Sequence, residues 1–434
     1  MSARRGFGAV FPEALRYGDG ALRVPASPFR LQAIDGPRLD RASRSPAEIG
    51  DALGRPIAAP PLPELFRGAR RVLVVVPDGT RTAATALFLP ALVEAIEVAG
   101  RPKISFAVAS GIHRPPTEEE IRGILGPDLA GRFPVLRHDP DDRASLADLG
   151  RTRAGTPVRV LEAVRRHDRI VLAGGAGFHY YAGFSGGRKA LVPGLSSRET
   201  VTRNHLRALR PDGSRHPKAR AGRLDGNPVH RDMVEGAALV GPDLVVNSVL
   251  CDGGGIERLF VGHWRRAHEA ACRHLLATRR VRVAPRDLVV ASAGGAPADV
   301  NLIQSHKAFE SGFGALRPGG VFVLVARCPE GAGHGDFLPF LDLPDEGAMA
   351  AELAADFRVY RQTALAWFRK ASRCRLVLVS DLPADTVRRL RAEPAGNLAE
   401  AFAIARRHLS EGTEGWVLAA AGRLLVEPDV PLRA

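Results

Sequence analysis

Seven short apolar runs recur along this chain of 434 residues, and the segments between them have the length and polarity of helices and loops. The runs cover residues 71–77, 103–109, 170–173, 243–250, 287–293, 320–326 and 375–380. Apolar strands that alternate with helices are typical of parallel sheets with helices on both faces. The chain is therefore expected to form an α/β fold with mainly parallel sheets.

The length of the chain suggests two or three domains, and its 45% of hydrophobic residues are enough to build complete cores. An arginine-rich helix is expected over about residues 263–280, followed by a linker near residue 282. We therefore predict an N-terminal domain over 1–281, which holds the cofactor and catalytic residues, and a C-terminal α/β domain over 282–434. A cleft between the two domains would hold the substrate, because clefts at domain interfaces are common ligand sites.

One stretch, from Gly174 to His205, is rich in residues that can do chemistry. It contains Lys189, one of only five lysines among 61 basic residues. A lysine that has lost its proton can attack an electrophile, whereas a guanidinium stays charged and cannot. Lys189 is thus a candidate covalent residue, with a surface lysine after a turn as the alternative.

Ser185, Gly186 and Gly187 come just before this lysine. Glycines lack side chains, so their backbone N–H groups can approach a phosphate closely. The same residue types are also ordinary turn formers. Because they stand beside Lys189, we expect these three residues to contact a cofactor.

Two of the predicted strands end in polar loops, and in open α/β sheets ligands bind where strands end. After the first run, Asp78 could bind a ribose hydroxyl or another cofactor group, and Arg81 could pair with a carboxylate or phosphate. After the second run, His113 precedes a helix that should begin near Thr117, because Thr117 and Glu120 have capping-box spacing. The alternatives are a turn with a surface arginine, and a structural or exposed histidine.

Several separated segments resemble the nickel-pincer lactate racemase family, over roughly residues 70–310. HYYAGFSGGRKALVPG is similar to the family segment in which a histidine acts as an acid/base and a lysine is bonded to the cofactor. The resemblance gives those roles to His179 and Lys189. RNH resembles the segment that carries the nickel-binding histidine, which is His205 in this chain.

Three further segments carry the resemblance. PDGTR supplies Asp78 and Arg81, SGIHRPPTEEE supplies His113 as the second catalytic histidine, and SAGGAPADVNLIQSHK supplies Gln304 and Lys307. The resemblance implies that His113 and His179 form an acid/base pair, one for each hand of the substrate. Arg81, Gln304 and Lys307 would hold the substrate carboxylate or the cofactor.

The activity implied by the resemblance is that of a racemase or epimerase of 2-hydroxy acids, which works by proton-coupled hydride transfer. Imidazoles suit the proton steps because they titrate near neutral pH, but no side chain accepts hydride, so a cofactor is required. The implied cofactor is the nickel-pincer nucleotide, a pyridinium-3,5-bisthiocarboxylic acid mononucleotide with carbon-bound nickel, joined to Lys189 through a thioamide. His205 would complete the nickel site, for which imidazole is a suitable donor.

This chain departs from the family pattern at two places. Ile303 stands before Gln304 where the family usually has a tyrosine, so a polar contact is lost. The aromatic residue expected later in the second domain has three candidates, Phe357, Tyr360 and Trp367. We therefore expect a 2-hydroxy acid with a side chain larger than the methyl of lactate.

Other features of the chain narrow the alternatives. The net charge of +14 comes from scattered arginines with no nucleic-acid motif, so an anionic substrate explains it better than DNA or RNA. The four cysteines form no CxxC pair, and three histidines of the helix near 263–280 lack the spacing of a shared face, so those histidines are expected to be solvated. The sequence has no bilayer-spanning run or signal-peptide core, which predicts a cytoplasmic protein without a membrane partner.

Two other functional classes remain open from the sequence. One is a lyase or hydrolase with a simple divalent metal held by histidines on the same scaffold. The other is a protein that is not an enzyme and binds the cofactor or nucleic acid. For the racemase, the expected partners are a small anionic 2-hydroxy acid and the enzymes that make the cofactor.

Overall fold

The computed structural model describes residues 11–34, 42–79, 81, 83–251 and 254–429. The chain divides into two compact units. The larger unit comprises the described parts of Leu39–Arg210 and Arg215–Ala277, and the smaller unit those of Met1–Arg38, Pro211–Ser214 and Thr278–Ala434.

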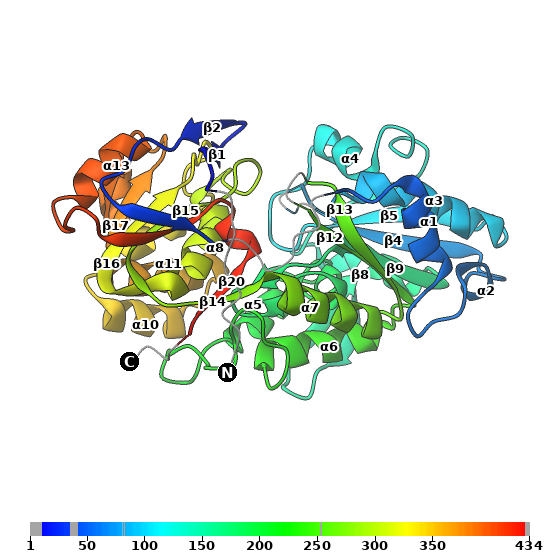
Figure 1. Ribbon diagram of the computed structural model, residues 1–434. Coiled ribbons are helices and arrows are strands. Elements are labelled where there is room, and N and C mark those ends of the chain that lie inside the picture. The colour runs from blue at the N-terminus through cyan, green and yellow to red at the C-terminus, as the bar shows by residue number, and fades with distance from the viewer. Residues whose placement is uncertain (1–10, 35–41, 80, 82, 252–253, 430–434) are drawn as a thin grey trace, which may run out of the picture. The chain divides into compact units, whose positions relative to one another are not determined.

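The larger unit is built on a six-stranded sheet with the order β13-β12-β9-β4-β5-β6 (Figure 1). Its strands are β4 (Arg71–Pro77), β5 (Lys103–Ala109), β6 (Val135–Leu136), β9 (Arg169–Gly175), β12 (Leu244–Leu250) and β13 (Ile256–Gly262). All neighbouring pairs are parallel except β12 and β13. The central strands are buried along most of their length, as the apolar runs predicted.

Both faces of this sheet are covered by helices (Figure 1). On one face lie α1 (Pro46–Gly54), α2 (Leu62–Leu65), α3 (Thr85–Val98) and α4 (Glu118–Leu125). The other elements are α5 (Arg198–Leu206), α6 (Pro228–Val240), α7 (Arg266–Arg279), and the hairpins β7 (Leu146–Arg151) with β8 (Pro157–Leu161) and β10 (Phe178–His179) with β11 (Gly183–Phe184).

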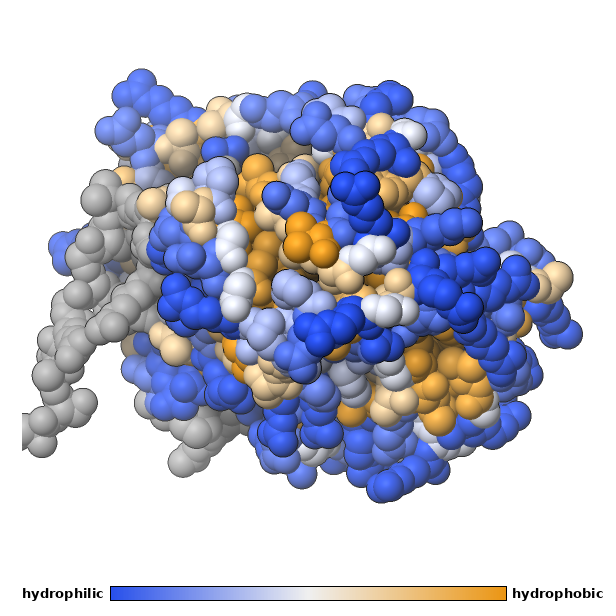
Figure 2. Space-filling model, turned by 90° about the vertical axis from the view of Figure 1, so that its right-hand side faces the viewer, coloured by the Kyte–Doolittle hydropathy of each residue, from blue (hydrophilic) through white to orange (hydrophobic). Residues whose placement is uncertain are grey.

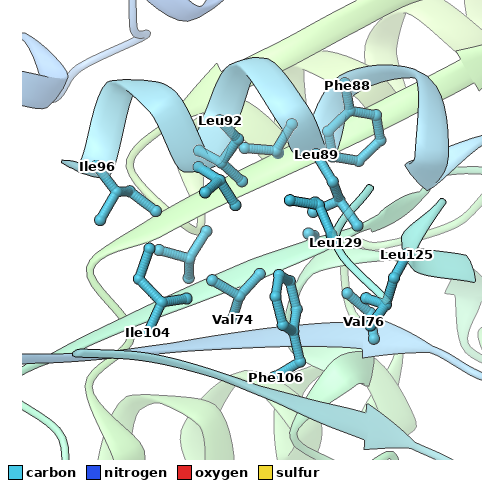
Figure 3. Close-up of a cluster of buried hydrophobic side chains, with 14 of the residues drawn as sticks. Val74, Val76, Phe88, Leu89, Leu92, Ile96, Ile104, Phe106, Leu125 and Leu129 are labelled. Atoms are coloured by element: carbon cyan, nitrogen blue, oxygen red, sulfur yellow. The ribbon is translucent and has the colours of Figure 1, made fainter. Parts of the chain in front are cut away.

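The side chains of β4 point alternately into two hydrophobic cores, one on each face of the sheet. Val74 and Val76 point into the cluster under α3, which also contains Phe88 and Leu92 of that helix and Phe106 of β5 (Figure 3). Leu73 and Val75 belong instead to the cluster on the opposite face. Successive side chains of a strand point to opposite faces, so a continuous apolar run fills both layers. The surface seen in Figure 2 is by contrast mostly hydrophilic, with small apolar areas between polar side chains.

The predicted start of the helix after β5 is confirmed. Thr117 caps α4: its hydroxyl accepts the N–H of Glu120, and the Glu120 carboxylate accepts the N–H of Thr117. These two bonds satisfy donors that a helix start would otherwise leave unpaired. The cap fixes where the loop carrying His113 ends.

The smaller unit contains a second six-stranded sheet, in which all neighbouring pairs are parallel and the order is β18-β17-β16-β15-β19-β3. Its strands are β3 (Arg30–Ala33), β15 (Arg286–Ser292), β16 (Leu316–Val325), β17 (Arg375–Val379), β18 (Ala392–Ala395) and β19 (Glu414–Leu418). Its helices are α8 (Leu302–Gly312), α9 (Phe337–Leu341), α10 (Glu346–Ala355), α11 (Val359–Ala371), α12 (Ala384–Arg389) and α13 (Leu398–Ala405). Two small pairs complete it, β1 (Ala14–Tyr17) with β2 (Gly20–Arg23) and β14 (Arg280–Val283) with β20 (Leu425–Pro428).

The predicted α/β fold with mainly parallel sheets is confirmed, but the limits of the units differ from the proposed domains. Residues 11–34 were expected in the domain over 1–281, whereas the structure assigns them to the smaller unit. The reason is that β3 adds to the edge of the second sheet beside β19. Strand β14, rather than a linker, occupies the region near residue 282. Among the described residues, no helix has both the length and the apolar character needed to cross a membrane.

Candidate active site

The topology of the larger unit creates a natural ligand site at one edge of its sheet. From β4, the chain places β5 and β6 on one side and β9 and β12 on the other. Ligands bind outside the carboxyl ends of strands at such a switch in direction. Asp78 follows β4 directly, His113 lies in the loop after β5, and His179 lies shortly after β9. Three of the predicted residues therefore share this edge.

Asp78 and His113 form a close pair. The imidazole Nδ1 of His113 lies 2.6 Å from Oδ2 of Asp78, whose residue is only 4% exposed. An ionised carboxylate can only accept, so Nδ1 donates and the neutral ring carries its lone pair on Nε2. The carboxylate of Asp78 contacts His113, and binding of the cofactor by Asp78 stays a prediction.

The two arginines near this pair differ in their surroundings. Arg81 is partly exposed, in a turn in which its N–H donates to the carbonyl of Asp78 at 3.1 Å. Arg114 makes a two-pronged ion pair with Glu120, at 2.8 and 2.7 Å, and so supports the helix cap. The guanidinium of Arg114 lowers the pKa of Glu120. Arg81 is the better placed of the two for an incoming anion.

His179 belongs to the short hairpin of β10 and β11, where it is paired with Gly183. The backbone N–H of Ala182 donates to Nδ1 of His179 at 3.3 Å. A neutral imidazole has one donor and one acceptor nitrogen, so the proton of this ring is on Nε2. His113 and His179 thus have opposite tautomers, with a lone pair on Nε2 in the first and a proton on Nε2 in the second.

Tyr181 brings the other predicted residues together. Its ring centroid lies 4.4 Å from that of His179 and 4.9 Å from that of His205, both in edge-to-face arrangements. The Nζ of Lys189 lies 5.7 Å from the centroid of the same ring, within range of a cation–π contact. Tyr181 is 4% exposed, so its buried ring is a fixed surface against which His179, His205 and Lys189 lie. Tyr181 was not among the residues predicted from the sequence, although the two adjacent tyrosines of HYYAGFSGGRK are a signal for it.

His205 is buried in α5, at 3% exposure, and its Nδ1 makes no hydrogen bond to any residue that the structure describes. Burial, followed by the positive charge of Lys189, lowers the pKa of His205 to about 3. The carbonyl of Val201 opposes this effect, without reaching hydrogen-bond geometry to Nδ1. The ring is therefore neutral at physiological pH, which is the form that binds metals. A buried ring nitrogen without a partner is also a plausible ligand atom.

The turn before Lys189 is tightly packed. The N–H of Ser185 donates to the carbonyl of Gly177 at 2.8 Å, and its hydroxyl approaches the same oxygen at 3.3 Å. Gly186 and Gly187 have positive φ angles of 81° and 53°. A Cβ atom on Gly187 would lie 2.7 Å from Cγ of His268. Packing and backbone conformation thus account for the two glycines, and their contact with a phosphate stays a prediction.

Residues of α7 were also misjudged. The sequence indicated that the histidines of this helix are solvated, but His268 is 2% exposed. It lies beneath the glycine turn, where its Nε2 is 2.7 Å from the guanidinium of Arg188. Cys272, one turn along α7, is also buried, and Cys251, Cys272, Cys328 and Cys374 are all free thiols.

Gln304 and Lys307 lie together in the smaller unit. Both are on α8, and Nζ of Lys307 donates to Oε1 of Gln304 at 2.5 Å. This helix follows β15, whose neighbours β16 and β19 continue the sheet in opposite directions. The start of α8 therefore lies at the switch point of the second sheet, where ligands also tend to bind.

The structure separates the aromatic candidates of the smaller unit. Trp367 is fully buried, and its indole N–H donates to the carbonyl of Leu390 at 2.9 Å, so it is a core residue. Tyr360 stacks on His334, with ring centroids 3.9 Å apart. His334 lines a cavity of about 490 Å³ together with Glu330 and Arg389. Of the candidates, Tyr360 is therefore in contact with a residue that lines a cavity.

Comparison with known proteins gives a consistent result along the chain. A model of the lactate racemase N-terminal domain matches residues 17–216, and one of the lactate racemase C-terminal domain matches residues 281–420. A lactate racemase from Thermoanaerobacterium thermosaccharolyticum is 31% identical over 325 residues, which are 74% of this chain and 75% of that protein. A lactate racemase from Lactiplantibacillus plantarum is 29% identical over 299 residues, 68% of this chain and 70% of the relative.

Solved structures agree with these matches. The lactate racemase apoprotein from Thermoanaerobacterium thermosaccharolyticum superposes with a TM-score of 0.86 at 27% identity, covering 95% of this chain and 99% of that one. A protein from Thermotoga maritima shares the fold, with a TM-score of 0.70 at 18% identity, covering 90% of this chain and 100% of that one.

Proposed function

Because the chain belongs to the lactate racemase family and is a racemase, we propose that it interconverts the two hands of a 2-hydroxy acid by proton-coupled hydride transfer. Inversion through a ketone needs one group to take the hydroxyl proton and another to return a proton from the opposite side. It also needs an acceptor for the hydride, which side chains do not provide. The first two needs can be traced to residues of this chain.

The observation that carries the proposal is that His113 and His179 lie at the same edge of the sheet, each with one ring nitrogen in a hydrogen bond. Nε2 of His113 has a lone pair and can remove the hydroxyl proton of one enantiomer, because Asp78 holds its Nδ1–H. Nε2 of His179 can return a proton to the oxygen after this ring has taken up a second proton, because an imidazolium becomes a neutral ring when it gives that proton up. In the reverse direction the two rings exchange roles. An acid and a base present together are what a racemase needs.

The residues also suit the nickel-pincer nucleotide implied by the family. His205 offers a neutral, buried imidazole whose Nδ1 has no hydrogen bond in the described structure, and Lys189 offers an amine near the same Tyr181 ring. We propose that His205 binds the nickel, that Lys189 is joined to the cofactor, and that Ser185, Gly186 and Gly187 contact it. When bound, the cofactor would supply the hydride acceptor.

A metal at His205 would need donors from outside the protein. Within the described parts of the chain, no three His, Cys, Asp or Glu side chains gather where they could hold an ion. A structural or hydrolytic metal site in proteins generally has three or four such ligands. This finding supports a cofactor that brings its own donors over a simple metal bound by histidines.

The substrate would be held by its carboxylate. Arg81 is partly exposed near the carboxyl end of β4, and Gln304 and Lys307 are in contact at the start of α8. We propose that these three residues bind the substrate or the cofactor, with guanidinium and ammonium groups matching anionic oxygens. Ile303 is partly exposed beside Gln304 and would make the pocket more apolar, which favours a substrate larger than lactate.

The proposal is tested on protein made together with the enzymes that synthesise the cofactor, so that the cofactor is supplied. Intact mass and nickel content should show one nucleotide adduct per chain, and chiral chromatography should show inversion of at least one member of a panel of single-enantiomer 2-hydroxy acids. Lys189→Arg should lose the adduct and the activity together, whereas Lys218→Arg, at an exposed position, should keep both. An adduct retained in Lys189→Arg would contradict the attachment, and inversion of no panel member by the loaded protein would contradict the function.

A further inference from the structure

Arg188 is a buried cation next to Lys189, and the catalytic scheme above does not use it. It is 1% exposed, and among the residues that the structure describes no carboxylate lies within ion-pair distance of its guanidinium. Burial lowers the pKa of Arg188 to about 10. Buried charges without an opposite charge are costly, so they are kept only where their hydrogen bonds serve a purpose.

The hydrogen bonds of Arg188 join the two ends of the loop that carries the active-site groups. One amino group, NH2, donates to the carbonyl of Ala182 at 3.0 Å, and the other, NH1, donates to the carbonyl of Gly186 at 3.3 Å. Ala182 is the residue whose N–H fixes the tautomer of His179. The carbonyl of Gly186 also accepts the N–H of Lys189, at 3.2 Å. One guanidinium thus connects the acid/base ring to the backbone of the lysine.

The guanidinium of Arg188 is also held by a hydrogen bond to His268 of α7. NH1 lies 2.7 Å from Nε2 of His268, which must accept because a guanidinium has only donors. The proton of His268 is therefore on Nδ1, which donates to Oδ1 of Asn247 at 2.9 Å. Burial, with the charge of Arg188 as a second cause, lowers the pKa of His268 well below its usual value and keeps the ring neutral. Arg188, His268 and Asn247 thus form a series of hydrogen bonds in which each group has a fixed donor or acceptor role.

From these contacts we propose that Arg188 is a positioning residue, which fixes the tautomer of His179 and the position of the Lys189 backbone through the carbonyls of Ala182 and Gly186. The proposal rests on the proposed function for the roles of His179 and Lys189. It requires the fork of the guanidinium and not only its charge, because a lysine has one nitrogen and cannot span both carbonyls and His268 in the same geometry.

The primary test measures which ring nitrogen of His179 carries the proton in the cofactor-free protein. It uses ¹⁵N NMR of histidine-labelled samples, with His179→Gln to assign the signals. In the unmodified protein, Nδ1 of His179 should give the signal of an unprotonated, hydrogen-bonded nitrogen and Nε2 that of a protonated one. Arg188→Met should give a mixture of both tautomers. Arg188→Lys should give the same change, and it carries the test if the methionine variant does not fold.

Two control variants separate positioning from loss of stability and loss of charge. Ile96→Ala opens a cavity in the core under α3, and Arg231→Met removes an exposed arginine from α6 of the same unit. Both should keep the His179 signals of the unmodified protein. A His179 spectrum unchanged in Arg188→Met and Arg188→Lys would overturn the proposal, and so would an equal change in Ile96→Ala.

A second measurement follows the loaded enzyme. Residues that orient a catalytic or metal-binding group typically contribute roughly 10–100-fold, so kcat of Arg188→Lys should fall by that factor while KM changes less. A kcat equal to that of the unmodified enzyme would overturn the proposal. If the unmodified loaded protein inverts no 2-hydroxy acid, the proposed function fails, whereas the NMR arm still decides the role of Arg188.

Discussion

One hydrogen bond holds the second ring nitrogen of each histidine that we propose as an acid/base group. His113 turns Nδ1 to the carboxylate of Asp78, while His179 accepts the backbone N–H of Ala182. Both partners are buried or part of the backbone, so they hold the rings without competing with substrate for Nε2. Each of these hydrogen bonds thus favours one tautomer of the neutral ring.

The role of Asp78 can be tested with Asp78→Asn. The amide keeps the size of the side chain but removes the negative charge that stabilises a protonated His113. Racemisation by the loaded enzyme should fall by roughly a hundredfold or more, the usual range for a disabled acid/base group. The mass of the cofactor adduct should be unchanged, as in the exposed control Asp128→Asn. Loss of the adduct in Asp78→Asn would instead indicate that this carboxylate holds the cofactor.

At the scale of elements, the short helix from Gly187 to Ala190 and the glycine turn before it determine where Lys189 lies. The turn rests on α7 through His268 and on β12 through Asn247, and both contacts need residues without side chains at 186 and 187. Strands β9 and β12, which pair with each other, also contact this short helix. The position of the Lys189 amine is therefore a consequence of packing between elements.

This dependence predicts a large effect of Gly187→Ala. Its Cβ would approach His268 to 2.7 Å, and its φ of 53° is unfavourable for alanine. Gly68→Ala is a matched control, since φ is 73° there but no atom lies within 4 Å of the added Cβ. A left-handed alanine costs about 1–2 kcal/mol, and overpacking adds about 1–3 kcal/mol, so Gly187→Ala should lower the free energy of unfolding by clearly more than the control. Equal losses in urea unfolding would contradict the packing argument.

For the molecule as a whole, the division into units does not follow the order of the chain. The smaller unit takes its edge strand β3 from the N-terminal part of the sequence and its other five strands from residues after 285. Phe29, just before β3, packs edge-to-face on Phe402 of α13, with ring centroids 6.0 Å apart. The N-terminal segment is therefore part of the core of the smaller unit.

Phe29→Ala tests this assignment. Removing a buried phenylalanine costs about 3–5 kcal/mol, because the packing is lost and a cavity remains. Hydrogen exchange should become faster in β19 and α13 of the smaller unit and stay unchanged in β4 and β5 of the larger unit. Phe11→Ala, at a residue 39% exposed, should change neither. Faster exchange confined to the larger unit would show that the segment belongs there.

The larger unit should also be sensitive to acid. Burial lowers the pKa of His138, His205, His230 and His268, and that of His230 falls to about 3. These rings are neutral when folded but take up protons when unfolded, below about pH 6.5. The contribution of these rings to the free energy of unfolding should thus be constant above about pH 6.5 and fall at lower pH. For His205 and His230, whose pKa is about 3, the fall should continue towards pH 3 by about 1.4 kcal/mol per pH unit for each ring.

His230→Leu removes one such ring and should flatten the pH dependence of stability by up to that amount. The control is His167→Leu, at a partly exposed histidine whose Nδ1 donates to the carbonyl of Ala163. Stability can be followed by urea unfolding at a series of pH values. An unchanged slope for His230→Leu would mean that this ring is already protonated in the folded protein.

Local patterns in the sequence were sufficient for the elements and for several site residues. The apolar runs predicted the central strands, and Thr117 with Glu120 predicted the start of α4, because strand alternation and helix capping depend on residues only a few positions apart. The motif HYYAGFSGGRK singled out His179 and Lys189 because the two lie close in sequence. Their positions around one tyrosine ring agree with that choice, and their catalytic roles remain predictions.

Only the tertiary structure decided which distant residues meet. Asp78 and His113 are 35 positions apart, and Arg188 and His268 are 80 apart, so no local pattern reports their contacts. The pairing of β3 with β19 could not be predicted from the sequence either. Strand β3 has only four residues, and its sequence resembles that of many loops. A chain encodes such contacts only through the packing of whole layers, in which burial, hydrogen bonding and shape must be satisfied together. For that reason the acid/base tautomers, the buried cation beside Lys189 and the true extent of the smaller unit emerged from the fold alone.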